Sequence, residues 1–563
     1  MRRLAAIAAL TTALVPVAAD AKTVRVFAVG PKLTLEWVDT RGDFRDHMLG
    51  LVDKSVRGPD VQKEAGDVAG HLLSGERNLV ALPEDLGLMA IFSGSRGADA
   101  RRAGDVTTAI VNVLQAYAPQ TAYYSGKYPS LASRGIPTRV LGLAATDTFA
   151  RVAVETYAEI AQRLGVWLEG GVNMAQDWQV VCTSKADMPA IPGGVGCDVE
   201  DPARVAMLQT TDEPNRPYAY EATSDRASNM ALVFDPQGRL VSRQIKTYLT
   251  PIELPGQLDL APGAVFTGLT ALETPVGTLG FVTSKDAWMP DVTARLDQLG
   301  VDLLVQPEFF VGDTIATQGP WAPDNIKGSG YSDVLRHPSI EAMVLPELTG
   351  NLFDLSADNQ QAIVVKPRGR SPRGHLLGQP EARGWKVVGD WVVDDPIGAP
   401  IPQRRRRLGE IGEKLLPREG NEPCAKPQVR GVCRGGHVED VIWADVQVAR
   451  DPAYRPRPRR RAGRTPFSVN RPIAGADVRQ RNVALATDGR LVAAAFEQGA
   501  DVVVARSADG GRTWAAPVSL GPGETPAVAV SGDVVWVAWS TGTLPGARIQ
   551  VTRSEDAGAT FAA

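Results

Sequence analysis

The sequence predicts an α/β fold for most of the chain and a small all-β region after it. Up to about residue 450, short segments rich in β-forming residues alternate with amphipathic helical segments, the pattern of a sheet covered by helices. Residues 230–249 predict a hairpin, because two β-rich runs flank a Pro-Gln-Gly turn. Near the end of the chain, two copies of a short turn motif, each after a β-rich run, predict the all-β region.

The predicted strands of the α/β domain are short and mostly apolar. They cover 23–30, 78–84, 165–174, 277–283, 301–308, 362–367 and 441–448. Two helices are predicted from apolar stripes that stop at a glycine. The first spans 149–164 and stops at Gly165, and the second spans 291–299 and stops at Gly300.

The beginning of the chain predicts export. Two arginines precede an apolar run at 4–18, and a small-x-small triplet follows at 19–21. The run is too short to cross a bilayer comfortably, and its flanks are typical of a cleaved signal peptide. We therefore expect residues 1–21 to be removed and the mature protein to be periplasmic or extracellular. No later segment predicts a membrane span.

Length and charge limit what the protein can be. A chain of 563 residues is too long for one ordinary core, so we expect two or three units. The formal net charge of -4 offers no general attraction for nucleic acid or anionic membranes. Arginines cluster at 404–407 and at 451–475, a Pro- and Arg-rich segment that we predict to be a linker. A nucleic-acid role for these arginines is the alternative, but no basic domain accompanies them.

Four cysteines occur as two close pairs. Cys182 and Cys197 enclose one Gly- and Pro-containing loop, and Cys424 and Cys433 enclose another. In an exported protein such pairs predict two disulfides, although sequence alone does not determine their connectivity. A metal site is the alternative, but neither pair has the C-x-x-C spacing of structural zinc. Because the five histidines are scattered, no metal ion or other cofactor is expected.

The all-β region at 476–563 contains the repeated turn motif. Ser507, Asp509, Gly511, Thr513 and Trp514 carry the first copy, and residues 554–561 repeat it. Both resemble the Asp-box of sialidase-type β-propellers, in which polar side chains bond the turn and the aromatic packs between strands. The box is a structural turn and implies no sialidase activity. Two copies cannot close a propeller of typically about 4–8 blades, so we expect a truncated chain or an open accessory sheet.

Three chemically capable residues lie at the ends of predicted strands, and we expect their side chains to converge. Glu84 ends the strand at 78–84, Lys246 lies in the second half of the hairpin, and Ser284 follows the strand at 277–283. Their surroundings resemble the nitrilase, or carbon–nitrogen hydrolase, superfamily. The resemblance is carried by ALPEDLG, ASNMALVFDPQG, RQIKTYL, GFVTSKDAWMPD, GVDLLVQPEFF and HVEDVIWADVQV.

The resemblance covers residues 22–450, with insertions at about 95–147 and 368–436. It implies a four-layer αββα sandwich that hydrolyses non-peptide carbon–nitrogen bonds, and a homodimer. In that family the glutamate is the general base, the lysine stabilises an anionic tetrahedral intermediate, and a cysteine forms an acyl-enzyme.

Carried over by position, these three catalytic roles fall on Glu84, Lys246 and Ser284. Glu253 matches an additional glutamate of some branches, and Asp286 is the aspartate of the cysteine motif. We therefore expect both to contribute to ligand binding.

The chain departs from the family at the nucleophile, because Ser284 stands where the cysteine is expected. A thiol has an ordinary pKa near about 8.5 that a neighbouring cation lowers, so a carboxylate can generate the thiolate. A serine hydroxyl is a far weaker acid, and serine enzymes use an imidazole or a neutral lysine as base. No histidine lies in a matching segment.

Three functional hypotheses follow. The first is a catalytically impaired protein that binds a small amide- or amine-like ligand or a partner, with Glu84, Lys246 and Ser284 kept at least as a buried hydrogen-bonded cluster. The second is an active amidase that uses Ser284 or an activated water. The third is a glycan-binding or adhesion protein that contacts a surface partner through the Asp-box repeats.

Overall fold

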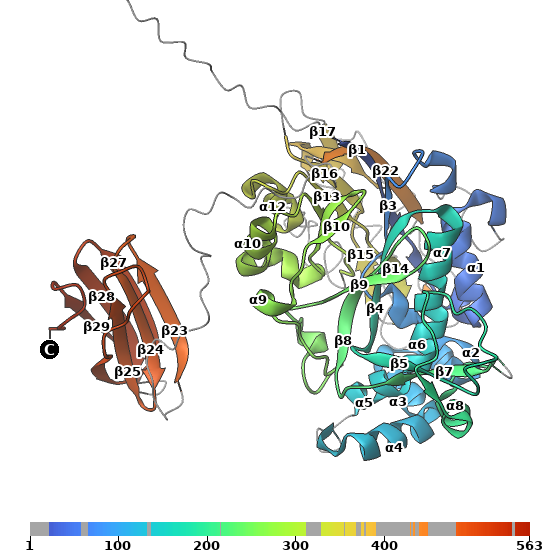
Figure 1. The fold of residues 1–563 in the computed structure, drawn as a ribbon, viewed down its shortest axis with the longest axis horizontal. Coiled ribbons are helices and arrows are strands. Elements are labelled where there is room, and N and C mark those ends of the chain that lie inside the picture. The colour runs from blue at the N-terminus through green and yellow to red at the C-terminus, as the bar shows by residue number, and fades with distance from the viewer. Residues whose placement is uncertain are drawn as a thin grey trace, which may run out of the picture. The chain divides into compact units, whose positions relative to one another are not determined.

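The structure is a computed structural model of the chain. It describes residues 22–57, 66–131, 137–213, 216–310, 328–353, 355–367, 373–376, 379–389, 428–429, 432–433, 439–448, 480–542 and 546–562. Contacts divide the chain into two compact units, Met1–Arg455 and Pro456–Ala563. Figure 1 shows helices and strands in the first unit and strands in the second. The predicted signal peptide, the predicted linker and most of the 368–436 insertion lie outside the described residues.

One mixed sheet of the first unit has the strand order β22-β1-β3-β4-β8-β9. These strands are β1 (Lys22–Gly30), β3 (Asn78–Ala81), β4 (Trp167–Ala175), β8 (Ala227–Phe234), β9 (Leu240–Ile245) and β22 (Asp440–Val448). β1, β3 and β4 run parallel, whereas β22, β8 and β9 pair antiparallel to their neighbours. The hairpin predicted over 230–249 is confirmed by β8 and β9, which meet at a turn where Gly238 has a φ of +75°.

A second mixed sheet has the order β10-β11-β12-β13-β16-β19. Its strands are β10 (Leu272–Thr274), β11 (Gly277–Phe281), β12 (Leu303–Val305), β13 (Ala342–Leu345), β16 (Ala362–Val365) and β19 (Trp385–Val388). β11, β12 and β13 are parallel and carry no charged side chain. β12 and β13 are apolar and fully buried, and in β11 only Thr278 is partly exposed.

Apolar side chains from both sheets share one core, which includes Val26 and Ala81 from the first sheet and Phe281 and Val305 from the second. A larger core contains residues of the first sheet together with α1 (Arg41–Val52) and α7 (Glu155–Leu164). A third core contains residues of the second sheet together with α10 (Pro290–Leu299) and Val334 of α12 (Gly330–Arg336). Apolar residues on both faces of each sheet are therefore buried, which explains their near-continuous apolar sequences.

The helix predicted over 149–164 is interrupted in the structure. α6 (Thr146–Phe149) leads into a π-helical turn at Ala150–Val154, and α7 then continues to Gly165, which has a φ of 65°. An apolar stripe with a period of 3.6 residues does not reveal a single wider turn, so the sequence pattern could not predict it. The second predicted helix, 291–299, is present as α10 and ends at Gly300.

The insertion at 95–147 is largely helical. Its main helices are α3 (Val106–Ala116), α4 (Ala118–Lys127) and α5 (Thr138–Ala144). Tyr117 and Tyr124 are buried in the same core as the first sheet. The insertion is therefore packed into the α/β unit.

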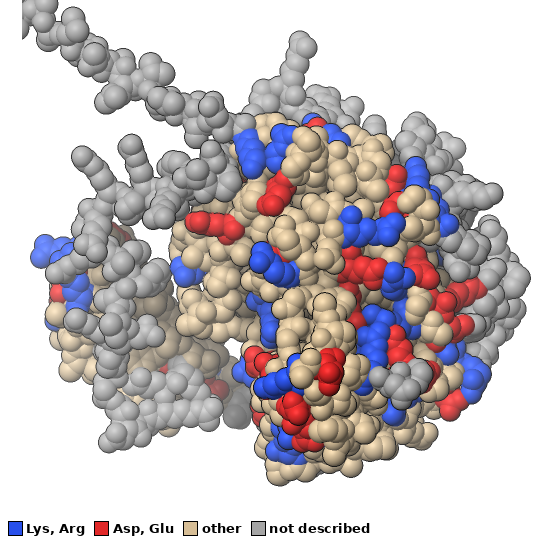
Figure 2. All heavy atoms as spheres, turned by 45° about the vertical axis from the view of Figure 1, so that its right-hand side comes forward, with Lys and Arg blue, Asp and Glu red and all other residues tan. Residues whose placement is uncertain are grey.

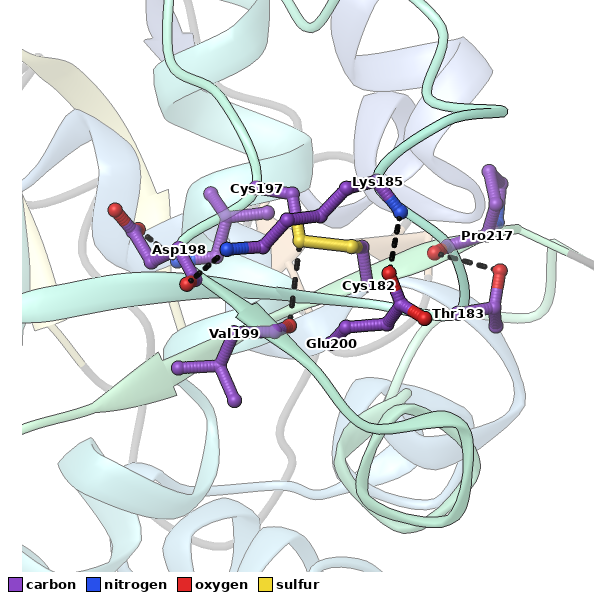
Figure 3. Close-up of a disulfide and its surroundings, with 9 residues drawn as sticks. Cys182, Thr183, Lys185, Cys197, Asp198, Val199, Glu200 and Pro217 are labelled. Atoms are coloured by element: carbon purple, nitrogen blue, oxygen red, sulfur yellow. Dashed lines mark hydrogen bonds between the residues drawn. A yellow bond between two sulfur atoms is a disulfide. The ribbon is translucent and has the colours of Figure 1, made fainter.

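A small sheet, β5 (Trp178–Cys182), β6 (Val199–Glu200) and β7 (Tyr218–Ala222), lies within the first unit. Cys182 at the end of β5 is joined to Cys197 by a disulfide, which closes a loop with a sequence separation of 15. Figure 3 shows this disulfide, with the Lys185 amine donating to the Asp198 carbonyl at 2.9 Å across the same loop. The first predicted disulfide is thus present; Cys424 and the Cys433 side chain lie outside the described residues, so the second stays a prediction.

The second unit consists of strands. β23 (Gln480–Thr487), β24 (Val492–Gln498), β25 (Asp501–Ser507) and β26 (Val518–Pro522) form one antiparallel sheet, and β27 (Glu524–Ser531), β28 (Val534–Thr541) and β29 (Arg548–Ser554) form another. Residues of both sheets share an apolar core. In the first repeated turn, Asp509 accepts hydrogen bonds from the Thr513 amide at 2.9 Å and the Thr513 hydroxyl at 2.7 Å. Asp556 accepts the matching pair from Thr560.

No helix within the described ranges combines the length and the apolar character that crossing a membrane requires.

Candidate functional site

Three polar residues form a row where three parallel strands end. Phe281 of β11, Val305 of β12 and Val344 of β13 are aligned across the sheet. Three residues beyond each of them lie Ser284, Glu308 and Glu347 in turn. Because aligned parallel strands end at the same edge, equal offsets bring these side chains together. Two further contacts keep the row in register, since the Ser284 amide donates to the Pro307 carbonyl at 3.0 Å and Glu308 and Glu347 form a parallel β-bridge.

Ser284 begins a short 3-10 helix, Ser284–Trp288, directly after β11. Its φ is 48°, in the left-handed region that residues with a Cβ rarely adopt. The residue is 6% exposed, so its strained backbone is held inside the unit. A strained turn at a strand end presents a side chain away from the sheet, and such strain is concentrated at functional sites. The position suits a nucleophile, as the sequence predicts.

Glu84 follows β3 of the other sheet and is almost fully buried. Its Oε1 accepts hydrogen bonds from Lys246 Nζ and Asn229 Nδ2, both at 2.7 Å. Its Oε2 accepts from the Phe309 amide at 3.2 Å, next to Glu308 in the row. Burial raises the pKa of Glu84, and the neighbouring Lys246 charge opposes that rise only in part.

Lys246, directly after β9, lies between two carboxylates. Its Nζ is 2.7 Å from Glu84 Oε1 and 2.9 Å from Glu253 Oε2. Burial by itself would lower the pKa of Lys246, but the charges of Glu84 and Glu253 raise it above its ordinary value. The pKa of Glu253 is lowered, since Lys246 and the Thr250 amide outweigh the effect of burial. Lys246 is therefore held as a buried cation at neutral pH.

Asn229 of β8 joins the two carboxylates and was not singled out from the sequence. Its Nδ2 lies 2.7 Å from Glu84 Oε1, 2.9 Å from Glu253 Oε1 and 3.3 Å from Asp85 Oδ1. The asparagine stands in the segment ASNMALVFDPQG, whose resemblance indicated a strand without marking the amide as part of a site.

Glu308 and Glu347 were also missed, although each follows a buried apolar strand and a proline. Burial, the largest effect, and the charge of Glu84 raise the pKa of Glu308 to about 8, against hydrogen bonds from Ser284 and Gln306. Glu347 Oε1 accepts from Asn359 Nδ2 at 2.6 Å. Burial and the charges of Glu308 and Glu84 raise the pKa of Glu347 well above its ordinary value. Acidic residues after a Pro at two neighbouring strand ends were the signal available in the sequence.

Asp286, which the sequence predicts to help bind a ligand, bonds the segment after Lys246 in the structure, and its ligand-binding role stays a prediction. Its carboxylate accepts hydrogen bonds from the Thr247 hydroxyl at 2.6 Å, the Thr247 amide at 3.0 Å and the Tyr248 amide at 2.7 Å. These bonds tie the segment that follows Lys246 to the helix that begins at Ser284. Burial raises the pKa of Asp286 to about 6 despite these donors.

The structure thus brings Glu84, Lys246 and Glu253 into direct contact and places Ser284 in the adjoining row with Glu308. A buried cation beside several carboxyl groups and a strained serine can stabilise a developing oxyanion and move a proton. In the part of the chain that the structure describes, no three His, Cys, Asp or Glu side chains are arranged to hold a metal ion.

Neither a protein-family model nor a curated protein matches the chain. Similar solved structures include a mutant of the amidase from Nesterenkonia sp. AN1 with acrylamide added at its active-site cysteine. The two sequences are 12% identical, the match covers 65% of this chain and 91% of that chain, and the TM-score is 0.33.

A cysteine-to-serine mutant of that amidase, described as a member of the nitrilase superfamily, is also 12% identical, with 67% and 91% covered and a TM-score of 0.33. A carbon–nitrogen hydrolase from Helicobacter pylori G27 is 11% identical, with 61% and 82% covered and a TM-score of 0.31. Scores this low carry no argument about fold or activity, so the functional proposal rests on the residues of this chain.

Proposed function

We propose that residues 22–450 form an exported carbon–nitrogen hydrolase-like protein with a four-layer αββα arrangement. Its pocket binds a small amide- or amine-like ligand, and hydrolysis is impaired because Ser284 replaces the nucleophilic cysteine. The observation that carries this proposal is the buried contact between Glu84 and Lys246, 2.7 Å apart and 2% exposed each. Two ionisable groups are costly to bury, and such pairs are concentrated at sites of chemistry.

The contacts of Glu84 support impairment. In the described residues no hydrogen bond joins Glu84 to Ser284, and both Glu84 oxygens are bonded to other donors. A thiol would ionise beside Lys246 without a strong base, whereas an alcohol would not. Replacing sulfur by oxygen at this position therefore removes most of the nucleophilic reactivity while leaving the binding pocket in place.

An active amidase that uses Ser284 is the second candidate function, and one observation favours it. Glu308, whose pKa of about 8 is far above that of an ordinary glutamate, is within reach of the Ser284 hydroxyl. No such observation supports a glycan site in the repeats, because the Asp509 and Asp556 carboxylates bond their own turns. Figure 2 shows basic and acidic side chains intermingled on the described part of one face, an arrangement that does not favour a nucleic-acid partner.

An activity screen on simple amides and nitriles, with the wild type beside Ser284→Cys, tests the proposal. We expect the variant to hydrolyse at least one of these substrates roughly 10³-fold or more faster than the wild type, since loss of a nucleophile commonly costs several orders of magnitude. If the wild type hydrolyses a substrate as fast as Ser284→Cys does, and Ser284→Ala does not hydrolyse it, the serine is not impaired. No hydrolysis by a folded Ser284→Cys variant would remove the hydrolase part of the proposal.

A further inference from the structure

The row at the strand ends offers Ser284 a second carboxyl group. Ser284 and Glu308 occupy equal offsets beyond the aligned residues Phe281 and Val305 on neighbouring parallel strands. The hydrogen bond from the Ser284 amide to the Pro307 carbonyl, 3.0 Å long, holds the two segments together one residue before Glu308. Both side chains are buried, Ser284 at 6% and Glu308 at 1% exposure. Their approach is therefore built into the sheet.

Glu308 has a carboxyl oxygen without a hydrogen-bond partner among the described residues, whereas both oxygens of Glu84 accept hydrogen bonds. Glu308 Oε2 accepts from Gln306 Nε2 at 3.1 Å. The Oε1 of Glu308 is buried and has no hydrogen-bond partner among the described residues. The Ser284 side chain nevertheless lies close enough to the carboxyl group to lower the pKa of Glu308 as a donor. Hydrogen bonds between a nucleophile and its base are often long in ligand-free enzymes and tighten when substrate binds. The Glu308 carboxyl group therefore keeps an oxygen without a partner near the hydroxyl whose proton must leave.

We propose that Glu308, rather than Glu84, accepts the proton of Ser284, so that the site retains slow serine-based acyl transfer. The inference rests on the proposed acyl-transfer site and identifies its base. The groups that face Glu308 and set its charge are Glu84, Lys246 and the neighbouring Glu347. The two glutamates oppose its ionisation and Lys246 favours it. With a pKa of about 8, Glu308 is a stronger base than an imidazole of ordinary pKa about 6.5.

Acylation of Ser284 and hydrolysis of the acyl-serine need no cofactor. Ser284 Oγ gives its proton to the Glu308 carboxylate and attacks the acyl carbon, and the oxyanion that forms is stabilised by the Lys246 cation. Collapse of this intermediate breaks the bond to the leaving group, which takes the proton from Glu308 when it departs as an amine. Water then gives a proton to Glu308 and attacks the acyl-serine, and Ser284 Oγ regains that proton as the acid is released.

Acylation by p-nitrophenyl acetate tests this assignment in the full chain, with acetyl-Ser284 measured by mass spectrometry and Ser284→Ala as background. We expect Glu308→Gln to slow acylation about 100-fold or more, since a positioned base contributes roughly 10²–10⁴-fold. Glu169→Gln, which changes another buried glutamate outside the site, should stay within about threefold of the wild type. The wild-type rate should rise with pH around a midpoint near 8.

Two variants separate this inference from its alternatives. Glu84→Gln should still acylate, with a midpoint at lower pH, because removing the Glu84 charge lowers the pKa of Glu308. Ser284→Cys combined with Glu308→Gln should still react with iodoacetamide, because a thiol needs no strong base, and this shows that the pocket has folded. The inference is overturned if Glu308→Gln acylates like the wild type, or if Glu84→Gln abolishes acylation. The proposed function survives either result if Ser284→Cys remains reactive.

Discussion

At the scale of single residues, three glutamates of the candidate site, Glu253, Glu84 and Glu308, are in different electrostatic states. The pKa of Glu253 is lowered because its carboxylate contacts Lys246. Glu84 contacts the same lysine, but burial raises the pKa of Glu84. Glu308 makes no ion pair within the described residues, and its pKa is raised to about 8. Glu84 and Glu253 lie about equally close to Lys246, so the balance between burial and the surrounding charges and hydrogen-bond donors, rather than the distance to the lysine alone, sets which carboxyl group has the lower pKa.

Glu169 shows what a buried carboxyl group costs without such a partner. It lies on β4 between Ala81 and Val233, both members of the core between the sheets. Neither of its carboxyl oxygens completes a hydrogen bond of normal geometry among the described residues, and burial raises the pKa of Glu169 well above its ordinary value, which the nearby Leu82 amide opposes only in part. The folded state therefore keeps a proton on Glu169 at pH values where the unfolded chain releases it.

We predict that Glu169→Met stabilises the first unit by about 1–3 kcal/mol at pH 4, the usual cost of an unsatisfied buried polar group. The advantage should grow between pH 4 and pH 8. Wild-type stability falls by up to about 1.4 kcal/mol per pH unit above the unfolded pKa of about 4.3, until the folded-state pKa is passed.

Urea unfolding at several pH values measures both effects. Glu273→Met, at an exposed strand position, is the matched control and should change the free energy of unfolding by less than about 0.5 kcal/mol. A less stable Glu169→Met protein, or a difference that does not vary with pH, contradicts this account of Glu169.

At the scale of elements, the site depends on segments that the two sheets place against one another. Lys246 follows β9 of the first sheet and Ser284 follows β11 of the second. Asp286 connects their neighbourhoods through three hydrogen bonds to Thr247 and Tyr248. A buried aspartate that bonds the segment after Lys246 therefore helps to set the geometry of the lysine relative to the serine.

We predict that Asp286→Ala destabilises the first unit by about 2–4 kcal/mol, because three buried donors lose their acceptor. It should also slow iodoacetamide labelling of the Ser284→Cys variant about 10-fold or more, since Lys246 is no longer held beside the thiol. Asp105→Ala removes an aspartate that caps α3 at the surface and should cost only about 1 kcal/mol, with no effect on labelling. Equal labelling in the two variants would count against a positioning role for Asp286.

The sequence patterns predicted some parts of this arrangement and missed others for identifiable reasons. The strand ends at Glu84 and Ser284 were predicted because apolar runs stop there, and Lys246 was marked by its place in the hairpin. Glu308 was overlooked because an acidic residue after a strand is ordinary in a loop, and only the alignment of β11 with β12 brings it beside Ser284. A pairing register depends on long-range contacts that local sequence does not encode.

At the scale of the whole molecule, the chain consists of two compact units, and every candidate catalytic residue belongs to the first. The Asp-box predictions concern the second unit, where the repeated turns bond themselves. The insertion at 95–147 adds buried helices to the first unit, and none of its described residues belongs to the candidate site as defined above. The proposed chemistry therefore belongs to the first unit alone. There we propose that Ser284 occupies the position of a lost thiol nucleophile.

Covalent labelling tests this claim most directly. The full chain carrying Ser284→Cys is treated with iodoacetamide near pH 7, and modification is followed by mass spectrometry. Ser228→Cys is the matched control, because Ser228 is a buried serine on β8 whose hydroxyl bonds the Ala261 carbonyl.

We predict that Ser284→Cys is modified at position 284 at least about 100-fold faster than Ser228→Cys, because Lys246 favours the thiolate. A folded Ser284→Cys protein that reacts no faster than the control would contradict the central claim.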